Sequence, residues 1–180
     1  MNEIDTLLNA YKRFVQLPWK DNLSGAEKVW FVVYDPPLER RIRFRLPDFE
    51  TVTKKAGHSW ISLDLTDVFA EWMANHRYRE AYFESPEDMG PALQEFNDVV
   101  VANLENALTA SDIDNNTIVA ITGLASLFGL TRASSVLEKV TTSIRGRLLV
   151  FFPGQHEGSS YRLLDARDGW NYLAIPIKSE

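Results

Sequence analysis

Continuous apolar runs, rather than alternating ones, mark most of the strands predicted for this chain. The run Val-Trp-Phe-Val-Val-Tyr at residues 29–34 is rich in β-branched and aromatic residues. Such runs are typical of strands buried on both faces, as in a parallel sheet covered by helices. The strands predicted on this basis cover residues 29–34, 60–65, 117–121 and 147–152, with shorter candidates at 161–164 and 172–177.

Between these runs, apolar residues recur at helical spacing. Ile4, Leu7 and Tyr11, for example, lie on one side of a helix predicted over residues 2–16. Thr66 is expected to cap a second helix, because a threonine hydroxyl can accept from a free amide of the first turn. The helices predicted with most regular spacing cover residues 2–16, 68–73, 91–108 and 132–144.

Residues 38–57 give a mixed pattern. Their apolar positions suit two helical pieces divided at Pro47, with Gly57 as the C-terminal stop. Residues 42–46 also alternate like a strand, so the strand alternative stays open. Residues 77–90 show no regular spacing of apolar residues and are expected to be irregular. The strand predicted at residues 147–152 is expected to end at the Pro-Gly pair that follows it.

Strands that alternate with helices indicate an α/β fold. We therefore expect a three-layer sandwich in which a mainly parallel sheet has helices on both faces. No internal repeat, low-complexity segment or linker interrupts the pattern. Residues 1–180 are accordingly predicted to form a single α/β domain.

Composition narrows the function classes. The chain has no cysteine, which excludes disulfides, zinc–thiolate sites and cysteine nucleophiles and suits a reducing compartment. The N-terminus is acidic and no apolar run could span a bilayer, so we expect a cytoplasmic protein without membrane contact. The net charge of −6 argues against general nucleic-acid affinity, and DNA contact should be weak or indirect.

Catalytic motifs are scarce. Residues 122–131 follow a strand and precede a helix like a phosphate loop, but Leu130 stands where the lysine belongs and the loop is apolar, which favours a hydrophobic packing turn. Asp35 and Asp64 would lie at the carboxyl ends of neighbouring strands, where they could hold Mg²⁺ in a hydrolase or nuclease. Because nothing near them completes a site, a turn acid and a solvent-facing strand acid are the favoured interpretation. No catalytic residue, metal site or cofactor is predicted.

Two polar clusters suit binding rather than chemistry. Four arginines lie within residues 40–45, beside Phe44, and could meet phosphates or an acidic partner, or simply form a solvated helix face. Residues 162–171 combine arginines, acids and Trp170, a composition typical of interfaces, although internal ion pairs could equally stabilise a turn there. The residues predicted to bind a partner are Arg41, Arg43, Arg162, Asp165, Arg167, Asp168, Trp170 and Asn171.

Several long strings resemble one family. The most distinctive are GRLLVFFPG at residues 146–154 and YRLLDARDGWNY at residues 161–172. Supporting strings are ERRIRFRLP at 39–47, GHSW at 57–60 leading into DLTD at 64–67, and TG at 122–123 through SLFG at 126–129. Together they resemble BrxB, the small protein encoded in BREX bacteriophage-exclusion clusters.

The resemblance implies a role in restricting phage, beside a DNA methyltransferase, a large ATPase and the phosphatase-like protein PglZ. It brings no catalytic residues. The function expected from it is a non-catalytic adaptor or assembly component that binds PglZ or other BREX subunits, and a homodimer is left open. The alternatives are the Asp35–Asp64 enzyme and a DNA-contacting module that uses Arg40 to Arg45.

Overall fold

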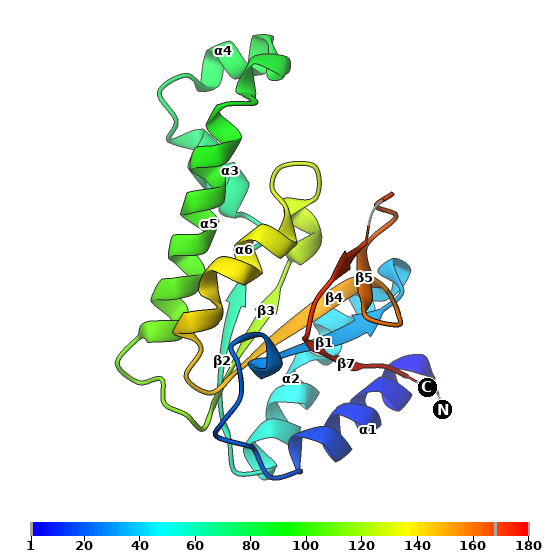
Figure 1. Ribbon diagram of the computed structural model, residues 1–180. Coiled ribbons are helices and arrows are strands. Elements are labelled where there is room, and N and C mark those ends of the chain that lie inside the picture. The colour runs from blue at the N-terminus through cyan, green and yellow to red at the C-terminus, as the bar shows by residue number, and fades with distance from the viewer. Residues whose placement is uncertain (1, 168, 180) are drawn as a thin grey trace.

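A twisted sheet forms the middle layer of the molecule (Figure 1). The computed structural model describes residues 2–167 and 169–179, and within them seven strands pair. Five run parallel in the order β2-β3-β4-β1-β7, while β5 pairs antiparallel with the far end of β4, and β6 with β5. Their bounds are β1 Val29–Tyr34, β2 Ser59–Asp64, β3 Thr117–Thr122, β4 Arg147–Glu157, β5 Ser160–Leu163, β6 Trp170–Asn171 and β7 Ile175–Ile177.

Helices cover both faces of this sheet, which confirms the predicted three-layer α/β sandwich (Figure 1). α1 (Glu3–Val15) and α2 (Glu39–Lys55) pack on one face around buried Tyr11, Ile42 and Phe49. α3 (Val68–Ala74), α5 (Ala92–Thr109) and α6 (Ala133–Val140) pack on the other, around buried Phe96 and Leu137. The short α4 (Arg79–Glu84) stands at the far end of α5, away from the sheet.

Central strands are buried along their length, as their apolar runs predicted. β1 and β3 are buried at every position. β2, at the edge of the sheet, alternates between half-buried and exposed residues instead. The pairing of Val29 with Leu148 and of Ile118 with Arg147 sets the amino ends of β1, β3 and β4 level with one another.

Two local predictions failed at prolines. α2 continues through Pro47 as one helix, where two pieces were predicted. Pro47 is exposed, so the helix loses one backbone hydrogen bond on its solvent side, while buried Ile42 and Phe49 anchor it on either side. β4 likewise runs past Pro153 to Glu157, because its extension leaves the parallel sheet and pairs with β5.

Smaller corrections concern helix ends and short elements. Thr66 does not cap α3: its hydroxyl donates to Asp64, and Asp67 occupies the N-cap position. Residues 77–90, predicted irregular, contain α4 and a 3₁₀ turn at Pro86–Met89. The helix predicted over residues 132–144 is α6 followed by a 3₁₀ turn. Of the last predicted strand, residues 172–177, only Ile175–Ile177 form a strand, β7, and the short β6 lies just before the predicted range.

Candidate partner-binding site

The loop that follows β3 is fixed against the loop that follows β2. Gly123 has a φ of +76°, and a Cβ there would meet the Asp64 carboxylate and the backbone and hydroxyl of Thr66, each at 2.6 Å. Only glycine permits both the left-handed backbone and this close approach. Buried Leu124 and Leu127 then hold a 3₁₀ turn in the core. This stretch is therefore a packing turn, and it delivers residues 128–134 to the carboxyl end of the sheet.

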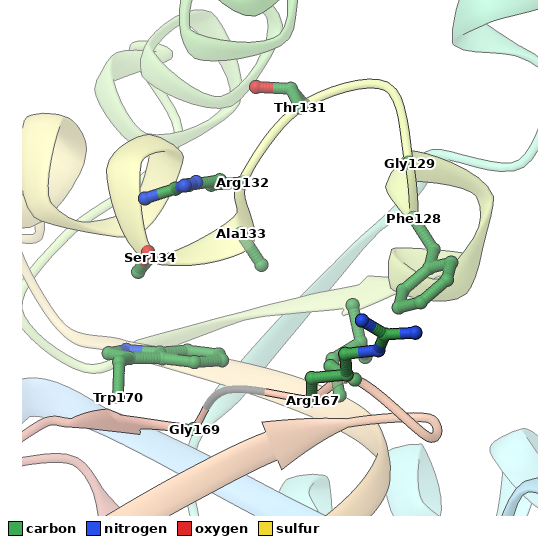
Figure 2. Close-up of a pocket in the computed structure, with 11 residues that line it drawn as sticks. Phe128, Gly129, Thr131, Arg132, Ala133, Ser134, Arg167, Gly169 and Trp170 are labelled. Carbon is green, nitrogen blue, oxygen red and sulfur yellow. The ribbon is translucent and has the colours of Figure 1, made fainter.

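A pocket of about 340 Å³ lies between that loop and the segment after β5 (Figure 2). In Figure 2 the indole of Trp170 lies along one wall, facing the loop and the start of α6, and Arg167 points toward Phe128. The pocket is lined by Phe128, Gly129, Thr131, Arg132, Ala133, Ser134, Leu163, Ala166, Arg167, Gly169 and Trp170.

Both walls of this pocket are tied to the core. On the loop side, the buried amide of Asn97 donates to the Thr131 hydroxyl and accepts from Lys139 at 3.1 Å, which joins α5, the loop and α6. On the other side, the Trp170 ring packs on Phe152, with ring centroids 5.7 Å apart. The site is therefore held by neighbouring elements rather than by its own loops alone.

The described residues that line the pocket carry a net positive charge. Arg132 and Arg167 are both exposed, and no acidic residue is found among the described residues that line the cavity. Phe128 adds an aromatic ring that is 44% exposed. Of the groups used for proton transfer, the lining offers only the hydroxyls of Thr131 and Ser134, with no carboxylate or imidazole beside them in the described part. The arrangement suits recognition of carboxylates and aromatic or apolar side chains.

Comparison with known families decides where this fold belongs. A protein-family model described as "BREX protein BrxB" matches residues 61–177. The chain belongs to the BrxB family. It is thus a component of a BREX system, which links it to antiviral defence by phage exclusion and makes other BREX subunits its expected partners. A search of curated proteins and a search of solved structures each found no match.

The matched region of this BrxB-family protein contains the whole pocket, strands β3 to β7 and all but the first two residues of β2. It also contains the distinctive strings at residues 146–154 and 161–172. Across residues 2–167 and 169–179, none of the helices has the length and apolar character needed to cross a membrane.

The C-terminal residues predicted to bind a partner are brought together only in part. Arg167 and Trp170 line the pocket. Arg162 and Asp165 are exposed on the same segment without lining it. Asn171 is exposed on β6, where its side-chain oxygen accepts from Ser159 at 3.4 Å. Asp168 lies outside the described residues.

Arg41 and Arg43, the other predicted binding residues, lie on α2 and do not line the pocket. Arg41 is exposed. Arg43 is held within the chain: its guanidinium donates to Glu39 at 2.8 Å, to Asp64 at 3.0 Å and to the Thr66 hydroxyl at 2.7 Å. Its role is thus to join α2 to the end of β2.

The proposed pairing of Asp35 with Asp64 was wrong in its geometry. β3 and β4 separate β1 from β2, so the two strand ends are three strand spacings, about 14 Å, apart. Burial opposes ionisation of Asp64, but hydrogen bonds from Thr66 and Arg43 outweigh it and lower its pKa below the ordinary value. No group of three or more His, Cys, Asp or Glu residues within the described chain could hold a metal ion.

Sequence reasoning missed Phe128, Arg132 and Ser134, which form the loop side of the pocket. The loop was interpreted only as a packing turn, which is correct for its buried half. An exposed aromatic followed by an arginine just before a helix was the available signal. What the sequence did not reveal is that residues 128–134 and 163–170 face each other.

Proposed function

We propose that this protein is a non-catalytic adaptor that docks on another BREX subunit through the pocket between residues 128–134 and 163–170, with PglZ as the first partner to test. The observation that carries the proposal is that two exposed guanidinium groups, on Arg132 and Arg167, line the same pocket as the rings of Phe128 and Trp170. Arginine and tryptophan are the residues that most often dominate binding energy at protein interfaces.

The partner surface should be acidic and partly apolar. Guanidinium groups bind carboxylates through paired, charge-assisted hydrogen bonds, and Arg167 has no hydrogen bond or ion pair with another described residue that would compete. The whole chain carries a net charge of −6, so the surface outside the pocket is acidic and would direct such a partner to this positive site. A cytoplasmic location, which the cysteine-free composition suits, is part of the proposal.

The test is a pull-down from cells that express the whole BREX gene cluster, with the wild type and the double variant Arg132→Ala, Arg167→Ala. Arg13→Ala, which removes an exposed arginine from α1, is the matched control. We expect the double variant to lose PglZ and phage protection while its melting temperature stays unchanged, and the control to keep both. Undiminished capture of PglZ by the double variant would disprove docking at this pocket.

The absence of catalysis is tested separately. Purified protein is expected to release no phosphate from ATP or GTP above background, because the loop after β3 lacks the phosphate-binding lysine. Turnover that disappears in Asp35→Ala or Asp64→Ala would replace the adaptor assignment with an enzymatic one.

A further inference from the structure

A second pocket lies at the opposite end of the sheet. Its volume is about 400 Å³, and it opens at the amino ends of β1, β4 and β7, where Trp30, Arg147 and Ile175 lie. Phe14 of α1, the loop between α1 and β1, and Leu173 just before β7 form the rest of its wall. The lining residues are Phe14, Leu17, Pro18, Trp19, Lys20, Leu23, Glu27, Trp30, Arg147, Leu173 and Ile175.

Arg147 is the unusual member of this set. Its side chain is only 4% exposed, yet no described carboxylate forms an ion pair with it. One terminal nitrogen donates to the Gly146 carbonyl at 3.0 Å and the other to the Lys20 carbonyl at 2.9 Å, but the Nε–H has no acceptor. Burial lowers its pKa, although the negative charge of Asp21 opposes the effect. A buried cation without a counter-ion is costly.

Trp19 supplies a second unsatisfied donor beside it. Its indole is stacked on His58, with ring centroids 3.7 Å apart, and the Arg147 guanidinium lies 4.8 Å from the indole centroid. The Nε1–H of Trp19 is buried without a hydrogen-bond partner. The acid that lines the pocket, Glu27, is already engaged, since its carboxylate accepts from the amide of Ser24 at 2.9 Å and from its hydroxyl at 2.7 Å.

The rim of the pocket is apolar and open. Leu17 is 57% exposed and Leu173 is 69% exposed, so apolar surface continues outside the cavity. Both leucines line the cavity, but a molecule confined to it would leave the outward part of their apolar surface in water. A segment of a protein could cover them and reach inward as well.

We propose that this pocket receives an acidic side chain, flanked by large apolar side chains, from a segment of a partner protein. The carboxylate would accept from the Nε–H of Arg147 and the indole N–H of Trp19 and would supply the missing counter-charge. The flanking apolar groups would cover Leu17 and Leu173. This site shares no lining residue with the pocket between residues 128–134 and 163–170, the carboxyl-end pocket. The two binding proposals can therefore be tested independently of each other.

The test uses the indole N–H signals of the ¹⁵N-labelled protein, which has five tryptophans, with Trp19→Phe to assign the relevant signal. The probes are capped tripeptides, acetyl-X-Glu-X-amide with X as Leu, Ile, Met or Phe, and their Gln counterparts. We expect the Trp19 signal to shift and saturate with Glu peptides, and the Gln peptides to bind at least about tenfold more weakly, because a charge-assisted hydrogen bond is lost.

Two variants complete the design. Leu173→Ser alters the exposed rim and should weaken Glu-peptide binding without changing the melting temperature, whereas Phe83→Ser, a 63% exposed residue of α4, should change neither. Arg147→Met should abolish the preference for Glu over Gln, and Leu173→Ser remains informative if that variant fails to fold. Equal binding of Glu and Gln peptides, or no shift of Trp19 with any peptide at millimolar concentration, overturns the proposal. So does free 4-methylvalerate binding as tightly as the peptides, since it would mark a small-molecule site.

Discussion

Replacing Trp170 by alanine should lower the stability of the protein, whether or not the residue also docks a partner. Its ring centroid lies 5.7 Å from that of Phe152, 6.3 Å from Tyr161 and 6.4 Å from Phe31. These rings form an aromatic cluster beneath the carboxyl-end pocket. Loss of the indole would therefore open a cavity beside β1 and β4.

The size of the effect follows from burial. A fully buried tryptophan costs about 3–5 kcal/mol when truncated to alanine, and Trp170 is only half-buried, so we expect about 2 kcal/mol. For a chain of this length that loss lowers the melting temperature by about 4–8 °C. Arg167→Ala should change the free energy of unfolding by no more than about 0.5 kcal/mol, because its side chain is exposed.

Urea and thermal unfolding of Trp170→Ala, Trp170→Phe and Arg167→Ala measure these differences. Trp170→Phe keeps a ring in the cluster and should recover part of the loss. An unchanged melting temperature for Trp170→Ala would refute the packing argument, and a large fall for Arg167→Ala would show that the arginine stabilises its own turn. The result also decides how a loss of partner binding is interpreted, since only a variant of unchanged stability tests docking.

Other expected outcomes concern the loops and α2. Gly123→Ala should cost at least about 2 kcal/mol in urea unfolding, because it combines a left-handed backbone with contacts of 2.6 Å; an unchanged midpoint would refute this. The lowered pKa of Asp64 means that its carboxylate stabilises the fold above the ordinary carboxyl pKa, and that this contribution is lost as the pH falls through the folded value. Asp64→Asn should therefore reduce the free energy of unfolding at neutral pH, and the variant should lose less of its stability than the wild type when the pH is lowered. Arg43 and Arg45 form ion pairs within the chain, so only the exposed Arg40 and Arg41 remain to contact DNA phosphates. A plot of log K for DNA binding against log salt concentration should therefore have a slope of about −2, and a much steeper slope would contradict this.

The layers of this fold could be predicted from the sequence because its central strands carry continuous apolar runs. Residues 29–34 were predicted to the residue, and β3 to within one. Long-range packing defeated the local rules at Pro47, which sits inside a helix anchored from both sides. Strand order was the other gap: no local signal places β3 and β4 between β1 and β2, and that order removed the Asp35–Asp64 site.

Only about half of the candidate site could be predicted, because the sequence does not show which loops face each other. Arg167 and Trp170 stood out by composition, whereas Arg132 became a candidate only once the fold placed it across the pocket. Arg147 shows another limit of sequence reasoning. It was correctly predicted to begin a strand, but only the structure shows that it is a buried cation without an ion pair to a described residue.

The two pockets lie at opposite ends of one rigid sheet, and this arrangement matters for an adaptor. β4 connects them directly: Arg147 begins the strand, and the extension that pairs with β5 supports the segment of Arg167 and Trp170. Two partner segments could therefore bind at once without competing for surface. Because both faces of the central strands are packed, each site would be held in a fixed orientation relative to the other. A small protein with no assembled catalytic group in its described residues can in this way fix the geometry between two larger subunits, which is what an assembly component of a multi-protein defence system has to do.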